Sequence, residues 1–98
     1  MSNHFDLEPT PLTVFPGQTA AFQCSIQTIP ETTSSPTWLK DDQPILLDHR
    51  MNVLPSGMFT ISDVMLSDRG EYSCRVDGVT GSKVSRSARL KIDLGELI

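Results

Sequence analysis

The stretch from Asp68 to Cys74 constrains the fold of this chain more than any other, because its residues have structural tasks that can be stated. Asp68 can accept hydrogen bonds at a turn, and Gly70 allows the backbone angles that a tight entry into a strand needs. Tyr72 can bury its ring and bond its hydroxyl to the backbone. Cys74 follows two residues later, so it faces the same side of a strand as Tyr72. The stretch therefore predicts a turn that leads into a strand with both side chains in the core.

Apolar residues alternate with polar ones in several further short segments, each of which predicts a half-buried β-strand. Turn residues such as Pro16-Gly17 separate these segments at intervals of about 8–12 residues. No segment of useful length has helical periodicity. An all-β sandwich of two sheets is the architecture that uses all of these segments. The clearest alternating positions are Ala20, Phe22, Cys24 and Ile26 in one segment and Ala88, Leu90 and Ile92 in another.

Three longer motifs surround a single tryptophan that lies between the two cysteines. They are Leu12-x-Val14-x-x-Gly17-x-x-Ala20-x-Phe22-x-Cys24, Trp38-Leu39-Lys40-Asp41-Asp42-Gln43-Pro44-Ile45 and Phe59-x-Ile61-x-x-Val64-x-x-x-Asp68-x-Gly70-x-Tyr72-x-Cys74. With these motifs, the chain from about Leu12 to Ile92 resembles an immunoglobulin domain of the intermediate set, the I-set. The resemblance implies an all-β, immunoglobulin-like (I-set) two-sheet antiparallel sandwich with one inter-sheet disulfide. Arg50 followed by Leu54-Pro55-Ser56-Gly57 also resembles domains of the neogenin and deleted-in-colorectal-carcinoma subclass of cell-surface receptors.

In the resembled fold, Cys24 and Cys74 form the disulfide. Two cysteines without a further metal-ligand cluster also favour a disulfide over a zinc site. The bridge would close a loop of about 50 residues, which is worth roughly 4 kcal/mol in the chain-entropy model. It would place the domain in an oxidising, extracellular compartment. The alternative is a pair of buried thiols in a reduced intracellular domain of the same family.

The resemblance implies roles for four more residues. Trp38 and Tyr72 would be the hallmark residues of the core, with Trp38 packed on the disulfide. Arg50 and Asp68 would form a structural ion pair at the base of the sandwich, between the start of the fourth strand and the turn before the strand of Cys74. Each assignment is a prediction about the interior of the fold rather than about a ligand.

We expect one domain with short flanking segments: residues 1–9 as an N-terminal lead-in, residues 10–93 as the immunoglobulin-like domain, and residues 94–98 as the stub of a linker. Pro9 and Pro11 mark a kink where an edge strand can change sheets. No apolar run approaches the ~18 residues that a transmembrane helix needs, and residues 1–10 lack the pattern of a signal peptide. We therefore expect an extracellular domain from a longer cell-surface membrane protein, with no membrane insertion of this segment itself.

Composition and motif spacing argue against several functional classes. The net charge is −4, which disfavours nucleic-acid binding. His49 and Asp48 have no serine placed on an identifiable nucleophile turn, so a solvated surface is favoured over a hydrolytic site. Asp41 and Asp42 are adjacent carboxylates without further ligand spacing, which favours a polar turn over a calcium site. We therefore expect no enzyme, no cofactor and no metal.

The alternation on three predicted strands indicates an outward face that can recognise a partner. Inward positions at Trp38, Cys74 and Leu90 force their neighbours outward, and in the resembled fold these strands belong to one sheet. An apolar side chain beside arginine is a composition that interface hot spots favour, although an isolated exposed leucine needs no function. The predicted partner-binding face consists of Leu39, Ser73, Arg75 and Arg89.

Two other binding sites compete with this face. The loop Thr28–Ser35 is rich in Thr and Ser and joins two strands at an end where such domains recognise partners. Six of the eight basic residues lie in the last third of the chain, and outward positions at Arg75, Arg89 and Lys91 make heparan sulfate a candidate ligand.

The leading functional prediction is a non-catalytic protein-binding or adhesion module in the ectodomain of a multi-domain cell-surface receptor for adhesion or guidance signalling. Its partners would be a protein ligand or neighbouring receptor domains, and a homophilic contact is a further option. The alternative is a structural spacer domain of an intracellular giant muscle or cytoskeletal protein. A count of free thiols would separate the two, because the spacer would hold its cysteines reduced.

Overall fold

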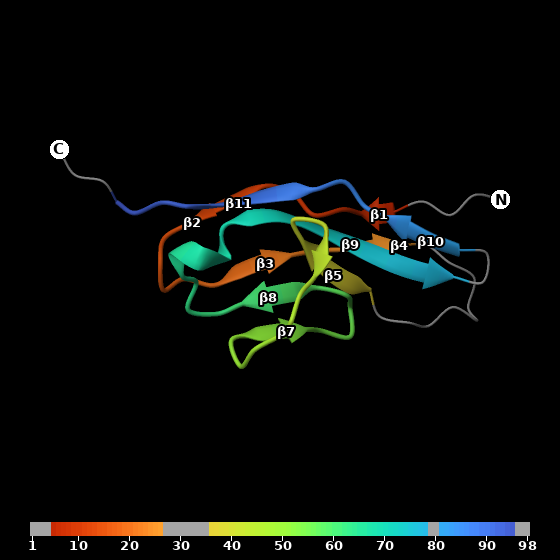
Figure 1. Ribbon diagram of the computed structural model, residues 1–98, viewed down its shortest axis with the longest axis horizontal. Helices are drawn as coiled ribbons and strands as arrows, with labels where there is room; N and C mark the ends of the chain where they lie inside the picture. The colour runs from red at the N-terminus through yellow and green to blue at the C-terminus, as the bar shows by residue number, and fades with distance from the viewer. Residues whose placement is uncertain (1–4, 27–35, 79–80, 96–98) are drawn as a thin grey trace.

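The computed structural model describes residues 5–26, 36–78 and 81–95, and these residues form short strands in two packed layers (Figure 1). The first layer is a six-stranded sheet with the order β2–β11–β9–β5–β6, in which β10 also pairs with β9. Its pairs are antiparallel except β2 with β11, which are parallel. Its strands are β2 (Leu12–Val14), β5 (Thr37–Lys40), β6 (Gln43–Pro44), β9 (Gly70–Gly78), β10 (Gly81–Val84) and β11 (Ala88–Ile92).

The second layer is a three-stranded sheet with the order β3–β8–β7. A two-stranded pair, β1 with β4, continues this layer, because β4 begins soon after β3 ends. A short 3-10 turn, η1 (Leu66–Asp68), connects the two layers just before β9. The strands of this layer are β1 (Phe5–Leu7), β3 (Ala20–Phe22), β4 (Ser25–Ile26), β7 (Met51–Val53) and β8 (Phe59–Ile61). The predicted all-β two-sheet sandwich is confirmed.

Four aromatic rings fill the space between the layers. Phe22 stacks on Tyr72 with ring centroids 5.0 Å apart, and Trp38 stacks on Phe59 at 5.4 Å. Phe22 and Phe59 come from the second layer, whereas Trp38 and Tyr72 come from the six-stranded sheet. Burial of one such side chain is worth about 1.5–3 kcal/mol. The alternation that predicted these strands is therefore the pattern that joins the two sheets.

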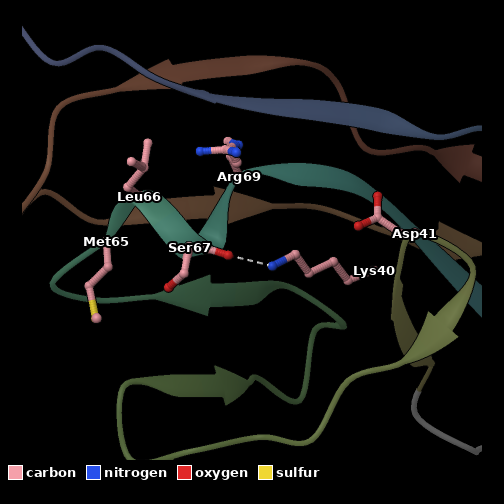
Figure 2. A pocket seen from close by; sticks show the side chains of 6 residues that line it. All are labelled: Lys40, Asp41, Met65, Leu66, Ser67 and Arg69. Atoms are coloured by element: carbon pink, nitrogen blue, oxygen red, sulfur yellow. Dashed lines mark hydrogen bonds between the residues drawn. The ribbon is translucent and has the colours of Figure 1, made fainter.

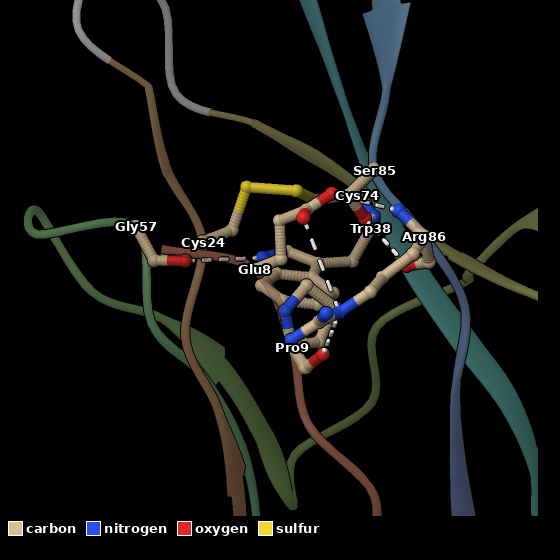
Figure 3. The surroundings of a disulfide bond; sticks show 8 residues. All are labelled: Glu8, Pro9, Cys24, Trp38, Gly57, Cys74, Ser85 and Arg86. Carbon is tan, nitrogen blue, oxygen red and sulfur yellow. Dashed lines mark hydrogen bonds and ion pairs between the residues drawn. A yellow bond between two sulfur atoms is a disulfide. The ribbon is translucent and has the colours of Figure 1, made fainter. Parts of the chain in front are cut away.

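Gly57 allows the close packing of the turn between β7 and β8 against the disulfide region. Its φ is +97°, and a Cβ atom at this position would lie 2.5 Å from the carbonyl oxygen of Cys24. Its own carbonyl oxygen accepts a hydrogen bond of 3.2 Å from Nε1 of Trp38 (Figure 3). A side chain here would therefore have to displace the backbone at Cys24.

The N-terminal segment differs from the predicted lead-in. Residues 5–7 form β1, which pairs with β4, and Pro9 is fully buried. The backbone N–H of Arg86 donates to Oε2 of Glu8 at 3.0 Å, and Nε of Arg86 donates to the carbonyl oxygen of Pro9 at 3.4 Å (Figure 3). These contacts come from the opposite end of the chain, which explains why the local sequence did not reveal them. Residues 5–9 therefore contact the sandwich, and the domain boundary at residue 10 stays a prediction.

Candidate functional site

Cys24 and Cys74 form a disulfide between the two layers, with Cα atoms 6.5 Å apart and a separation of 50 positions in sequence (Figure 3). Both side chains are buried, as is Trp38 beside them. The predicted inter-sheet disulfide is thus present, and it lies in the core rather than in a reactive, exposed setting.

Arg50 and Asp68 form a bidentate ion pair beneath the core. Nη1 of Arg50 lies 2.9 Å from Oδ2 of Asp68, and Nη2 lies 3.2 Å from Oδ1. Oδ2 also accepts the backbone N–H of Met65 at 2.8 Å. Burial by itself would raise the pKa of the Asp68 carboxyl, but the hydrogen bonds from Arg50 and Met65 outweigh it and lower that pKa below its ordinary value of 3.8. Asp68 is therefore ionised and held in place.

Arg50 also bonds to two more segments at this end of the sandwich. Nη1 of Arg50 also donates to the carbonyl oxygen of Asp63 at 3.0 Å, and Nη2 donates to Oδ2 of Asp48 at 3.3 Å. The hydrogen bond to Asp68 raises the pKa of the guanidinium, although desolvation opposes this. With these donors engaged, Arg50 joins the start of β7 to the segments that contain Asp48, Asp63 and Asp68.

Tyr72 completes the base of the sandwich, because its hydroxyl donates to the carbonyl oxygen of Asp68 four residues earlier. Its ring is buried against Phe22. Burial raises the pKa of the Tyr72 hydroxyl above its ordinary value of 10.0, and the negative charge of Asp68 adds to the rise. The hydroxyl therefore remains a neutral donor.

The outer face of the six-stranded sheet, meaning the side away from the second layer, differs from the prediction at two positions. Leu39 is only 6% exposed and Ser73 only 2%. Leu39 pairs with Ser73 on one side and with Pro44 on the other, so it lies between two neighbouring strands. Ser73 is a short side chain on the central strand β9. An outward position in the alternation therefore did not produce exposure here.

The two predicted arginines of this face are exposed but have acidic neighbours. The side chain of Arg75 is 39% exposed and its Nε lies 3.4 Å from Oδ1 of Asp77. Arg89 is 58% exposed, and its Nη2 donates to Oε2 of Glu71 at 2.6 Å. Each pair leaves part of its guanidinium in contact with solvent, so the face has a mixed rather than a strongly basic character.

Val84 is a member of the outer face that the sequence did not reveal. In the pairing of β10 with β9, Val84 lies opposite Arg75, and its side chain is 53% exposed. In the pairing of β11 with β9, Ala88 lies opposite Tyr72, so the register has moved by one residue between the two pairs. Counting back from the inward Ala88 would have placed Val84 in the core.

The register moves at Ser85, whose buried hydroxyl accepts the N–H of Cys74 in place of a backbone carbonyl oxygen. Oγ of Ser85 accepts the N–H of Cys74 at 3.0 Å and donates to the carbonyl oxygen of Arg86 at 2.8 Å (Figure 3). The backbone N–H of Ser85 meanwhile donates to the carbonyl oxygen of Cys74 at 2.8 Å. A bulge of this kind turns one strand's side chains over without breaking the sheet. No sequence signal marks it beyond the polar run Ser85-Arg86-Ser87.

The family model described as "Immunoglobulin I-set domain" matches residues 3–92. This chain belongs to the I-set family. Human neogenin is 34% identical over 88 residues, which are 90% of this chain and 6% of neogenin. The predicted resemblance to the I-set and to neogenin is therefore confirmed. The I-set chain spans a small part of that relative, so the activity of the whole relative does not transfer to it.

Solved structures with this fold come from more than one kind of protein. The tandem Ig repeats of Dlar superpose with a TM-score of 0.85 at 19% identity, covering 94% of this chain and 48% of that one. The titin M3 domain superposes with a TM-score of 0.79 at 24% identity, covering 93% of this chain and 96% of that one. At these identities the likeness concerns the fold alone. The same fold thus occurs in Dlar and in titin.

The remaining predictions concern the loop Thr28–Ser35, the linker stub, the Asp41-Asp42 turn, metal binding and membrane insertion. The loop Thr28–Ser35 and residues 96–98 of the predicted linker stub lie outside the described residues. Asp41 and Asp42 form a turn with φ values of 51° and 68°. Within residues 5–26, 36–78 and 81–95, no three His, Cys, Asp or Glu side chains form a group that could hold a metal ion. Among the same residues, no helix is long and apolar enough to cross a membrane.

Proposed function

We propose that this I-set domain is a protein-binding module of a cell-surface receptor and that it contacts its partner through the outer face of the six-stranded sheet. The contact is centred on Arg75 and Val84 and extends to Arg89. The observation that carries the proposal is the pairing of an exposed valine directly opposite a half-exposed arginine. Arginine beside an apolar anchor is a combination that interface hot spots favour.

Burial of Leu39 and Ser73 supports this contact in an indirect way. These two side chains support the sheet beneath the arginine instead of offering a contact surface themselves. Nε of Arg75 is buried without a hydrogen-bond partner among the described residues. This burial indicates that the base of the guanidinium lies close against the sheet. A side chain held in this way loses less conformational entropy on binding than a freely rotating one.

The relative neogenin and the disulfide support an extracellular location. A buried Cys24–Cys74 bridge is typical of proteins that fold in an oxidising compartment. The acidic neighbours of Arg75 and Arg89 weigh against heparan sulfate as the ligand of this face, because Asp77 and Glu71 partly neutralise it. We therefore infer a protein ligand, a neighbouring receptor domain or a second copy of the domain as the partner.

A spacer role is the second candidate function, and the arrangement of the chain ends favours it. β1 lies near one end of the sandwich and residues 93–95 leave from the other end (Figure 1). A domain with this arrangement can transmit tension along a linear array. The likeness to the titin M3 domain supports the suitability of the fold for that role. Alkylation of the protein from its natural source distinguishes the two functions, since two reactive thiols would indicate the intracellular spacer.

The experiment for the outer face compares two substitutions that each introduce an aspartate, one on each layer. Val84→Asp alters the proposed contact, and Ala21→Asp alters an exposed position on β3 of the other layer. Binding is measured against an array of purified cell-surface ectodomains, and self-association by sedimentation equilibrium. We expect Val84→Asp to weaken the interaction at least about tenfold and Ala21→Asp to leave it unchanged. Equal effects of the two variants would contradict the proposed face.

A further inference from the structure

A hollow of about 710 Å³ lies at the end of the sandwich where β11 terminates (Figure 2). It opens between the turn that follows β5 and the 3-10 turn η1, so two segments far apart in sequence form its sides. It is separate from the Arg75–Val84 contact, which lies at the other end of β9. Its lining residues are Lys40, Asp41, Met65, Leu66, Ser67 and Arg69.

The cations of this hollow lack carboxylate partners, unlike the arginines of the outer face. Nζ of Lys40 donates to the neutral carbonyl oxygen of Ser67 at 2.6 Å (Figure 2), and its charge acts on the Asp68 carboxylate without a direct salt bridge. Within the part of the chain that the structure describes, neither Lys40 nor Arg69 has a carboxylate within 4.0 Å. Leu90 pairs with Gly70 across antiparallel strands, so the next residues in each direction, Lys91 and Arg69, are neighbours.

The carboxylates nearest these cations are already engaged in the fold. Oδ1 of Asp41 accepts the N–H of Glu71 at 3.1 Å, and the carboxylate of Glu71 is paired with Arg89. Asp68 is paired with Arg50. Lys40, Arg69 and the adjacent Lys91 outnumber Asp41, the acidic residue that lines the hollow, on a chain whose net charge is −4.

Apolar side chains form the remaining wall of the hollow. Met65 is 50% exposed and Leu66 is 44% exposed, although both belong to a turn whose neighbours are polar. Their exposure follows from the geometry of η1, in which Asp68 takes the inward position and bonds back to the N–H of Met65. The result is a surface on which cations without a direct carboxylate partner and exposed apolar groups both line one hollow.

We propose that this hollow binds an acidic peptide segment of a partner protein. Carboxylates of the peptide face Arg69, Lys91 and Lys40, and an aliphatic side chain of the peptide packs on Leu66 and Met65. Charge complementarity supplies the attraction for the carboxylates. The apolar wall favours a peptide over a sulfated glycan, because a glycan brings no aliphatic group to cover it. This site is additional to the proposed outer-face contact and does not depend on it.

The test uses a synthetic pentapeptide, Glu-Leu-Glu-Glu-Leu with blocked ends, titrated into the domain and followed by backbone amide chemical shifts. We expect shifts at residues 40–41 and 65–69, with saturation at about millimolar concentrations. Arg69→Glu should weaken binding about tenfold, and Leu66→Ala about threefold. Lys83→Glu is the matched control, because Lys83 is an exposed cation on β10 and undergoes the same change of charge. It should alter binding less than about twofold.

Several results would overturn the proposal. Absence of saturable shifts at these residues would show that the hollow does not bind an acidic peptide. Equal binding of the peptide with Gln in place of Glu would exclude carboxylate recognition. Equal weakening by Arg69→Glu and Lys83→Glu would reduce the effect to overall charge. Competition by a heparin oligosaccharide, combined with no effect of Leu66→Ala, would assign the hollow to sulfated glycans instead.

Discussion

The base of the sandwich and the outer face of its larger sheet follow different rules. At the base, Asp68, Tyr72 and Arg50 are joined by short hydrogen bonds, and two of the three belong to one contiguous motif. On the outer face, exposure at Val84 and burial at Leu39 depend on which strands lie alongside. The comparison teaches that a buried polar cluster can be encoded locally, whereas a contact surface is a property of the assembled sheet.

Asp68→Ala tests the base with the largest expected effect. Removal of the carboxylate leaves the guanidinium of Arg50 buried without its partner and also removes a bond to the N–H of Met65. We expect the free energy of unfolding to fall by about 3–5 kcal/mol, as measured by urea denaturation with circular dichroism. Asp48→Ala is the control, because Asp48 is the 45% exposed partner of the same arginine. It should cost less than about 1 kcal/mol, and equal costs would contradict the comparison.

Acid should weaken the base of the sandwich, because protonation of Asp68 removes the charge that pairs with Arg50. The pKa of Asp68 is lower in the folded domain than its ordinary value of 3.8. Its ionisation therefore stabilises the fold above that value, and this stabilisation is lost as the pH falls through the lower, folded pKa. The loss should be smaller than in Asp68→Ala, since a protonated carboxyl still accepts hydrogen bonds. Unfolding midpoints of wild type and Asp68→Asn between pH 2 and 6 provide the measurement, and equal pH slopes for the two proteins would refute it.

Gly57→Ala tests how closely the turn between β7 and β8 must approach the disulfide region. The added Cβ would lie 2.5 Å from the carbonyl oxygen of Cys24, at a φ of +97°. We expect a loss of about 1–3 kcal/mol in the free energy of unfolding. The control is Gly17→Ala, at a φ of +88° with no atom within 4 Å of its added Cβ. A loss as large in the control would attribute the effect to backbone strain rather than to contact.

Ser85→Ala tests the bulge at which the register moves between the β10–β9 and β11–β9 pairs. The change removes the acceptor for the buried N–H of Cys74. An unsatisfied buried donor should lower the free energy of unfolding by about 1–2 kcal/mol. Amide hydrogen exchange at Cys74 should accelerate more than exchange at Leu39, whose strand pairs with β9 on the other side. Uniform acceleration across β9 would mean that the hydroxyl stabilises the whole sheet and does not act locally.

Changes confined to the outer face should have the smallest effect on stability. Val84→Asp and Arg89→Gln alter exposed side chains, so we expect the free energy of unfolding to change by less than about 0.5 kcal/mol. Thermal unfolding followed by circular dichroism measures this, with Leu39→Asp as the contrasting variant. Leu39 is 6% exposed, so a buried charge there should be strongly destabilising. A stable Leu39→Asp variant would contradict the burial of Leu39 and support the predicted exposed position.

The amino-acid sequence alone determined the fold class, the disulfide and the base. Alternation with period two fixes which side chains of each strand face the core, as at Phe22, Phe59 and Ile61. The motif from Asp68 to Cys74 carries its own turn chemistry, because Tyr72 bonds back to a residue only four positions earlier. Arg50 was identified through the family resemblance, since no local rule pairs residues 18 positions apart.

Only the tertiary structure decided what the surface offers to a partner. Leu39 is covered because β6 and β9 flank it, and Val84 is exposed because a bulge at Ser85 moves the register by one residue. β1 is a strand because it pairs with β4, where Phe5 lies opposite Ile26 and Leu7 opposite Ser25. Alternation predicts the direction of a side chain, but exposure depends on the length and position of side chains on neighbouring strands.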